Sequence, residues 1–365
     1  MKIAILADPL DTQNAGIHVF CKELIASLLT IDKQNQYYIV RAKESDDFPN
    51  ATELIFPINK KIPFHNRFRQ FTSIPKRLRD LNVDAVLELA HFGPFGLGDE
   101  IKKITFIHDL TPIIYPSFHS KLSVLMHKNL LPHILNKVDL IFCNSKATQT
   151  DLLKYFPVTI GKSQVAYLGC NKSFKPTLDK TILRKYNITK PYFLSVGTLE
   201  PRKNLTTLLE AWTNFKEKGG NEILVLTGSN GWNYQPLINK INANKFKSEI
   251  TLTGFVPESE LPSLYSQAKA MVYSSFYEGF GLPVLEAMAC GCPVIISDNS
   301  ALPEVGGTAA YYFNPNKSVA LEAILTKTST LDLQDAKNRS LAQANKFKWE
   351  NTASIIKAGI ENLFN

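Results

Sequence analysis

The stretch Ser195 to Trp212 reads SVGTLEPRKNLTTLLEAW. It continues an apolar run that begins at Tyr192 and has the length of a buried strand, and its later leucines recur at helical spacing. We therefore expect a strand at 192–197, a tight turn, and a helix that begins near Asn204, a residue type favoured at helix N-caps. Arg202 and Lys203 then stand between a strand and a helix.

The same alternation of short apolar runs and amphipathic stretches extends over the whole chain, and it is typical of parallel sheets with crossover helices. The first half shows expected strands at 2–7, 37–41, 85–89, 104–109 and 140–145, and a helix at 19–29. The second half shows expected strands at 192–197, 222–228, 250–254, 270–275 and 293–298. The predicted fold class is α/β, with two doubly wound units joined near residues 168–176.

Length and composition agree with two globular domains. The chain has 365 residues, of which 44% are apolar and 20% charged, and a single core rarely grows to this size. The N-terminal apolar run is too short for a signal peptide and no window is long enough to span a membrane, so we expect a cytoplasmic protein. Its five cysteines have no disulfide or zinc spacing and are expected to be free thiols.

The net charge of +8 favours anionic partners. It is most concentrated between Leu54 and Arg79, where seven basic residues and four phenylalanines occur without an acid. The set is Lys60, Lys61, Arg67, Arg69, Lys76, Arg77 and Arg79, with Phe56, Phe64, Phe68 and Phe71. This composition suits contact with an anionic membrane surface or an anionic acceptor. A solvated surface loop and helix explains it equally well.

Arg202 and Lys203 are the first candidate site residues. Two cations beside the positive end of a helix are unfavourable for the helix itself. A bound anion would explain them, and a guanidinium next to an ammonium suits a diphosphate. An exposed basic turn is the alternative explanation.

The second candidate stretch is YEGFGLPVLEAMACGCP at 277–293. Its pattern predicts a helix at 282–289, with Pro283 in the first turn and Gly291 at the end. Gly279 and Gly281 would leave backbone N–H groups accessible to a phosphate at the helix start. Glu278 in the loop and Glu286 in the helix could accept hydrogen bonds from sugar hydroxyls. They could also be an ordinary loop acid and a helix charge.

Three places in the first half, with four residues, complete the candidates. The dinucleotide fingerprint G-x-G-x-x-G is missing, and a single glycine, Gly16, precedes the first expected helix. His108, followed by Asp109, stands at the end of an expected strand in TFIHDLTP, and Ser145 does so in CNSKATQTDLLKYF. Each also has an ordinary structural explanation: a turn, a structural histidine and a helix cap.

The combination of GTLEPRKN with YEGFGLPVLEAMACGCPVIISDNSALPEV resembles the donor domain of retaining GT-B glycosyltransferases of family 4, with their Glu-x7-Glu signature. The resemblance is close over about 190–306. It implies two Rossmann-like domains facing a central crevice: an acceptor-binding domain at 1–170 and a donor domain at 171–345. It also implies that the helix at 346–365 packs back on the first domain.

The resemblance also implies roles for individual residues. Arg202 and Lys203 would bind the donor diphosphate, Glu278 would lie near the transferred sugar, and His108 would contact that sugar. The implied donor-binding positions are Gly16, Gly197, Val256, Gly279, Phe280, Gly281, Leu282, Pro283 and Glu286, of which Glu286 would accept from the ribose hydroxyls. Asp109 and Ser145 are weaker acceptor-side candidates.

The function implied is transfer of a hexose from a nucleoside diphosphate sugar, with retention and without a metal or cofactor. GDP-mannose is the first choice of donor. The expected acceptor is a lipid-linked or oligosaccharide hydroxyl in surface-polysaccharide or lipopolysaccharide assembly, with residues 54–79 at the inner face of the membrane. A UDP-sugar donor and a non-catalytic nucleotide-sugar-binding regulator are the alternatives. No nucleic-acid module is recognisable.

Overall fold

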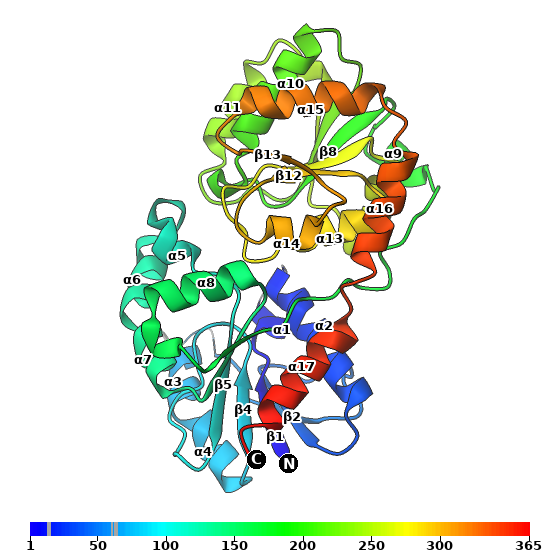
Figure 1. Cartoon of the computed structure of the whole chain (residues 1–365). Helices are drawn as coiled ribbons and strands as arrows, with labels where there is room; N and C mark the ends of the chain where they lie inside the picture. The colour runs from blue at the N-terminus through cyan, green and yellow to red at the C-terminus, as the bar shows by residue number, and fades with distance from the viewer. Residues whose placement is uncertain (13–15, 60, 62–64) are drawn as a thin grey trace. The chain divides into compact units, whose positions relative to one another are not determined.

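The computed structural model describes residues 1–12, 16–59, 61 and 65–365, with the side chains of 66 and 67 left out. The chain divides into two compact units (Figure 1). Unit 1 is Met1–Gly169 together with Lys348–Asn365, and unit 2 is Cys170–Phe347. Lys60 and Phe64 of the predicted basic segment lie outside the described residues.

Unit 1 contains a seven-stranded parallel sheet of order β3-β2-β1-β4-β5-β6-β7. The strands are β1 Lys2–Leu6, β2 Gln36–Arg41, β3 Thr52–Ile55, β4 Ala85–Glu88, β5 Lys102–Ile107, β6 Leu140–Cys143 and β7 Ser163–Val165. The five strands predicted for this half are all present. Their central residues are buried, because helices cover both faces of a parallel sheet.

The helices of unit 1 connect these strands in sequence (Figure 1). They are α1 Pro9–Thr12, α2 Gly16–Ile31, α3 His65–Phe71, α4 Ser73–Asp80, α5 Thr111–Ile114, α6 Lys121–Asn129, α7 Leu131–Lys137 and α8 Lys146–Tyr155, with 3-10 turns η1 Pro116–Phe118 and η2 Pro157–Thr159. The predicted helix at 19–29 is therefore longer at both ends.

The last helix, α17 (Trp349–Glu361), belongs to unit 1 although its sequence follows unit 2. It packs on α2 and β6, and both chain termini lie close to β1 and β2 (Figure 1). Gly359 permits this packing, because a Cβ there would lie 2.7 Å from the ring of Phe142. The crossing from unit 2 back to unit 1 falls at residues 347–348.

Unit 2 contains a six-stranded parallel sheet of order β10-β9-β8-β11-β12-β13. The strands are β8 Tyr192–Val196, β9 Ile223–Thr227, β10 Ile250–Gly254, β11 Ala270–Tyr273, β12 Val294–Ser297 and β13 Tyr311–Phe313. One face packs against α10, α11 and α15 around the buried indole of Trp212.

The helices of unit 2 again alternate with the strands. They are α9 Thr181–Lys185, α10 Leu205–Glu217, α11 Gln235–Asn242, α12 Leu261–Gln267, α13 Leu282–Ala289, α14 Leu302–Gly306, α15 Ser318–Thr330 and α16 Gln334–Ala344, with 3-10 turns η3 Pro201–Lys203, η4 Lys247–Glu249 and η5 Glu258–Glu260. Helix α13 has the predicted bounds.

Three strands escaped prediction: β3, β7 and β13. All three lie at the edge of a sheet and have three or four residues. Edge strands are partly exposed and short. The sequences TELI and SQV contain polar residues and lack the continuous apolar run of a central strand, and YYF has only three residues.

Both sheets reverse their strand order at one point. In unit 1 the order reverses between β1 and β4, and in unit 2 between β8 and β11. The chain leaves the two strands in opposite directions there, which opens a crevice beyond their carboxyl ends where ligands of doubly wound folds bind. We refer to these places as the switch points of unit 1 and unit 2.

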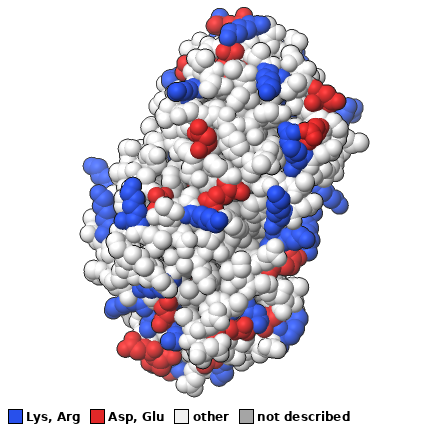
Figure 2. All heavy atoms as spheres, in the orientation of Figure 1, with Lys and Arg blue, Asp and Glu red and all other residues white. Residues whose placement is uncertain are grey.

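The surface carries both signs of charge. Figure 2 shows lysines and arginines interspersed with acids on the visible face, so the net charge of +8 is not gathered into one patch on this face. Among the described residues, no helix is both long enough and apolar enough to cross a membrane.

Candidate functional site

A cluster of opposite charges occupies the switch point of unit 2. Arg202 and Lys203 lie in η3 after β8, and Glu278 lies in the loop after β11. Arg202 Nη1 donates to Glu278 Oε2 at 2.9 Å, and Lys203 Nζ donates to Glu278 Oε1 at 2.7 Å. The structure thus brings Glu278 together with two adjacent cations that precede it in the sequence by 76 and 75 positions.

Neighbouring groups hold the two cations in place. Lys203 Nζ donates to the hydroxyl of Tyr273 at 2.6 Å and lies 4.8 Å from the centre of its ring. Arg202 donates to the carbonyl of Tyr277 at 2.9 Å and to the carboxylate of Glu200 at 2.8 Å. The positive groups are therefore oriented before any ligand arrives, which is the condition for effective electrostatic stabilisation.

Partial burial strengthens the electrostatic interactions among these charges. Burial alone would raise the pKa of Glu278, but Arg202 and Lys203 outweigh it and hold the pKa at about 2. Burial lowers the pKa of Lys203, and the charge of Glu278 opposes that effect. Glu278 is therefore ionised at neutral pH and acts as the anion that the two cations require. The predicted anion-binding pair is thus occupied by a carboxylate of the protein itself.

Asn204 differs from the prediction. It precedes α10 but adopts a left-handed conformation, with φ of 53°, and its side chain caps no backbone N–H group. Its amide donates to the carbonyl of Pro315 at 2.8 Å and its oxygen accepts from Thr207. Asn204 therefore occupies the predicted N-cap position, but its side chain does not cap the helix, because Pro315 and Thr207 engage it.

Glu286 has a different partner from Glu278. It lies in the second turn of α13 and accepts a hydrogen bond from the hydroxyl of Tyr265 at 3.0 Å. Burial raises the pKa of Glu286 to about 7; the Tyr265 hydrogen bond opposes this rise, and the charge of Glu258 adds to it. Its protonation therefore changes near neutral pH, unlike that of Glu278.

The glycine-rich turn before α13 has the predicted form. Gly281 stands at the N-cap with φ of 110°, and a Cβ there would lie 2.8 Å from a methyl group of Leu302. Only glycine fits this position easily. Gly279 and Phe280 precede it, and Leu282 and Pro283 begin the helix. The positive end of the α13 dipole thus lies at the carboxyl end of β11.

Two further predicted donor positions follow other strands of unit 2. Gly197 comes directly after β8 with φ of 145°, and a Cβ there would contact the Lys203 side chain at 3.5 Å. Val256 follows β10 and is buried, while its neighbour Phe255 is exposed. Both lie at the carboxyl edge of the sheet.

In unit 1, His108 belongs to a stack of histidines that the sequence analysis did not identify. Its Nε2 lies 2.8 Å from the carbonyl oxygen of Leu89, so Nε2 carries the proton and Nδ1 the lone pair. Its backbone N–H donates to His91 Nε2 at 2.8 Å, and the two rings stack at 5.3 Å. His91 adopts φ of 72°, an uncommon conformation for a non-glycine residue.

These imidazoles are neutral. Burial, with a smaller contribution from the neighbouring His108, lowers the pKa of His91 to about 3. Burial also lowers the pKa of His108, against the opposing effect of the Leu89 carbonyl. His127 packs edge-on to His91 at 5.8 Å and burial lowers its pKa as well. At neutral pH, His108 can therefore accept a hydrogen bond at Nδ1.

The remaining unit 1 candidates have visible structural tasks. Asp109 accepts from the backbone N–H and the hydroxyl of Thr111 at the start of α5. Ser145 is buried and caps α8, accepting from the Thr148 N–H at 3.0 Å. Gly16 is the first residue of α2, and a Cβ there would meet no atom within 4 Å.

The residues that sequence reasoning missed are mainly Tyr265, Tyr273 and His91. Tyr273 ends a strand at the switch point, so the carboxyl-end rule could have found it. Tyr265 and His91 are 21 and 17 residues from their partners, and no local spacing reveals them. Within the described ranges, no group of three or more His, Cys, Asp or Glu side chains is placed to hold a metal ion.

Two Rossmann-like sheets in one chain, with paired cations at a switch point, define the GT-B class of glycosyltransferases. Residues 179–346 match the family described as Glycosyl transferases group 1, and residues 16–174 match Glycosyltransferase Family 4. The chain is 35% identical over 269 residues to O-antigen chain mannosyltransferase B of Escherichia coli, covering 70% of each chain. The protein therefore belongs to glycosyltransferase family 4 and is a glycosyltransferase.

Two other similarities agree with this assignment. O-antigen chain mannosyltransferase RfbU of Salmonella typhimurium is 27% identical over 253 residues, which cover 68% of this chain and 67% of that one. The solved structure of sucrose-phosphate synthase from Thermosynechococcus elongatus superposes with a TM-score of 0.78 at 19% identity, covering 100% of this chain and 99% of that one. The latter supports the fold alone.

Proposed function

We propose that this enzyme transfers a mannosyl residue from GDP-mannose, with retention, to a hydroxyl of a lipid-linked or oligosaccharide acceptor in surface-polysaccharide assembly. The names of the two O-antigen mannosyltransferase relatives support the sugar and the setting. The observation that carries the chemistry is the cluster of Arg202, Lys203 and Glu278 at the switch point of unit 2.

The cluster suits departure of a nucleoside diphosphate. As the bond between the sugar C1 and the β-phosphate oxygen breaks, its electron pair moves to that oxygen. Arg202 and Lys203 supply positive charge where this negative charge grows. The acceptor oxygen forms the new bond to C1 from the side that the leaving group vacates, and its proton passes to the departing phosphate. Atoms and charges then balance without a protein nucleophile or a metal ion.

Donor binding would change the partners of Glu278. Its carboxylate neutralises the same two cations that a diphosphate would use. A bound diphosphate shares or takes over these contacts, which frees Glu278 to accept from a sugar hydroxyl. Glu286, on the following helix, is proposed to accept from the ribose, a task for which its ionised form is needed.

In unit 1, we propose that His108 accepts a hydrogen bond from the transferred sugar through Nδ1. Its Nε2 proton is committed to the Leu89 carbonyl and its pKa is lowered by burial, so it is neutral at physiological pH. These features support an acceptor of hydrogen bonds and argue against a general acid. Gly16, at the exposed start of α2, is proposed to approach the diphosphate.

We also propose contact with an anionic membrane surface through α3 and α4. Phe68 and Phe71 of α3 are 64% and 48% exposed, and Lys76, Arg77 and Arg79 of the following helix α4 are exposed as well. Arg69 is an exception, because its side chain is buried in an ion pair with Asp8. Apolar and basic groups on one surface favour the interface of an anionic bilayer.

Vesicle flotation tests the membrane proposal. Wild type should float with phosphatidylglycerol vesicles at low salt and not with phosphatidylcholine vesicles. The double variant Phe68→Ser, Lys76→Glu should lose this binding, whereas Lys317→Glu, an exposed charge in unit 2, should keep it. Equal flotation of the two variants would remove the basis for the proposal.

The transferase proposal is tested by a thermal-shift screen of GDP-, UDP-, ADP- and TDP-sugars against wild type and Lys203→Ala. We expect GDP-mannose to stabilise the wild type alone and to release mannose slowly. Stabilisation by a UDP-sugar would change the donor and keep the mechanism. Binding without sugar release, even with membrane extracts that contain lipid-linked acceptors, would favour the non-catalytic alternative. Retention is read from the anomeric configuration of the product.

A further inference from the structure

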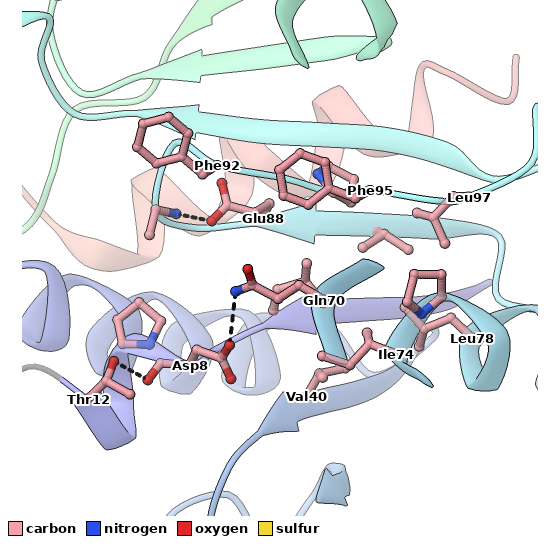
Figure 3. Close-up of a pocket in the computed structure, with 16 residues that line it drawn as sticks. Asp8, Thr12, Val40, Gln70, Ile74, Leu78, Glu88, Phe92, Phe95 and Leu97 are labelled. Carbon is pink, nitrogen blue, oxygen red and sulfur yellow. Dashed lines mark hydrogen bonds between the residues drawn. The ribbon is translucent and has the colours of Figure 1, made fainter. Parts of the chain in front are cut away.

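The switch point of unit 1 holds a cavity of about 200 Å³ that no part of the proposed donor chemistry uses (Figure 3). Leu6 and Asp8 line it at the end of β1, and Glu88 and Ala90 line it at the end of β4. It thus lies where the strand order reverses, which is the usual ligand position in a doubly wound sheet.

The wall of the cavity is divided between aromatic and polar groups. Figure 3 shows Phe92 and Phe95, from the segment after β4, across from Gln70 and Ile74 of α3 and α4. Phe95 is stacked on Phe71 with ring centres 4.3 Å apart, and Phe92 is packed edge-on to His127 at 4.8 Å. Both rings are therefore held in fixed orientations by neighbours outside the cavity.

The polar side is acidic. Asp8 accepts from Gln70 at 3.3 Å through Oδ2 and pairs with Arg69, whereas its Oδ1 is buried and has no hydrogen-bond partner among the described residues. Glu88 accepts from the Ala90 N–H and from the hydroxyl of Thr105. A buried carboxylate oxygen without a partner is unfavourable, and a ligand hydroxyl would satisfy it.

These properties select the ligand. Two carboxylates in the lining disfavour a phosphate, and the same carboxylates accept hydrogen bonds from hydroxyls. A cavity of roughly 150 Å³ holds benzene, and sites for drug-sized ligands measure roughly 300 to 1,000 Å³. About 200 Å³ therefore suits one six-membered ring with its substituents. An aromatic wall packs against the C–H face of such a ring.

We infer that this cavity is the subsite for the terminal pyranose of the acceptor, with Asp8 and Glu88 accepting from its hydroxyls and Phe95 packing on its apolar face. The inference deepens the proposed function and rests on it for the identity of the ligand as acceptor. The lipid or remaining saccharide of the acceptor lies outside the cavity. Asp8 and Phe95 are binding residues for the acceptor and make no contact that the donor requires.

Saturation-transfer NMR with methyl α-D-mannopyranoside, methyl β-D-galactopyranoside and methyl N-acetyl-β-D-glucosaminide tests the inference on the full chain. At least one glycoside should receive saturation from the wild type with GDP present. Phe95→Leu and Asp8→Asn should bind it roughly tenfold more weakly, the loss expected of one good aromatic or polar contact. The control Lys317→Glu, an exposed charge in unit 2, should bind it as the wild type does.

The GDP thermal shift, measured on the same samples, separates the possible outcomes. If both pocket variants keep this shift and lose the glycoside, the inference is supported. If wild type binds none of the three glycosides, or if Phe95→Leu binds them unchanged, the cavity is not the acceptor subsite. If glycosides bind as expected but GDP gives no shift in wild type, the donor proposal fails and the cavity assignment stands. Because Asp8→Asn also breaks the pair with Arg69, Phe95→Leu decides the matter should Asp8→Asn not fold.

Discussion

The two switch points occupy equivalent places in similar sheets, yet they are built in opposite ways. The switch point of unit 2 contains Arg202, Lys203 and Glu278, which pair over 2.7 to 2.9 Å. The switch point of unit 1 contains neutral histidines and a partly aromatic cavity. The fold therefore sets the position of a site in both units. The side chains at that position determine whether the ligand is bound mainly through charge or through the shape of the cavity.

Electrostatics explains why the charged site needs an internal partner. Two partly buried cations without an anion would be unfavourable, so Glu278 stabilises them until a ligand replaces it. The histidines of the unit 1 site need no such partner, because burial keeps their imidazoles neutral. Variants that change charge should therefore affect unit 2 more than unit 1, and the following predictions test that contrast.

The largest effect is expected from Arg202→Ala. Removing one preorganised charge from a leaving group costs about 10²- to 10³-fold in kcat, and the fold should be retained because the side chain lies near the surface, with 18% exposure. Steady-state kinetics at saturating donor measure this. Arg202→Lys keeps the charge without the guanidinium fork, so its kcat should lie between those of the wild type and Arg202→Ala. Activity within a few-fold of wild type in the alanine variant would show that Arg202 does not stabilise the leaving group.

Glu278→Gln should lower the free energy of unfolding by roughly 3 kcal/mol, the low end of the range for a broken buried ion pair. The unpaired cations should then bind GDP more tightly than in wild type, although turnover falls. Thermal denaturation with and without GDP, together with calorimetric titration, measures both changes. Glu200→Gln, at the more exposed edge of the cluster, is the control and should change stability less. Weaker GDP binding in Glu278→Gln would contradict competition between carboxylate and diphosphate.

The pH dependence of donor binding should report on Glu286. Its pKa of about 7 lies above the ordinary value of 4.5, so it is ionised only as pH rises through 7. Donor KM should therefore fall as pH rises from 6 to 8. The hydrogen bond from Tyr265 lowers this pKa, so Tyr265→Phe should move the midpoint to higher pH, by about one unit. Glu286→Gln should remove the dependence, and a midpoint that does not move in Tyr265→Phe would exclude Glu286 as its origin.

The same pKa has an opposite consequence for folding. Because the folded state binds the Glu286 proton more tightly than the unfolded state, the stability that this residue contributes is present below pH 4.5. It is lost as pH rises through about 7. For Glu278, whose pKa is about 2, the contribution is present above pH 4.5 and is lost as pH falls toward 2. Unfolding curves of the two Gln variants across this pH range separate these contributions.

The smallest effect is expected in unit 1, from Ser145→Ala. Loss of the α8 cap should cost about 1 kcal/mol of stability and leave the KM for donor and acceptor unchanged, because the hydroxyl is buried in the cap. Chemical denaturation and kinetics measure the two quantities. Ser145→Thr, which retains a capping hydroxyl, is the control. A rise in acceptor KM without loss of stability would show that Ser145 contributes to acceptor binding.

Much of the fold could be predicted, because buried parallel strands have a continuous apolar run that needs no tertiary information. All ten predicted strands exist, and the helix at 282–289 has the predicted bounds. The edge strands β3, β7 and β13 could not be found in this way, because TELI and SQV contain polar residues and YYF has only three residues. Asn204 lies at the predicted N-cap position, but its side chain contacts Pro315, 111 residues away, in place of capping the helix.

The sequence by itself determined the alternation of strands and helices and the residue types of the unit 2 site, since Arg202, Lys203, Glu278 and Glu286 lie in two short motifs beside strand ends. Only the tertiary structure determined which side chains pair with each other. In the structure Glu278 pairs with the two cations and Glu286 accepts a hydrogen bond from Tyr265. Asp8, Glu88 and Phe95 lie around one cavity. The physical reason is that strand order, which the local pattern does not contain, selects which loops meet at a switch point.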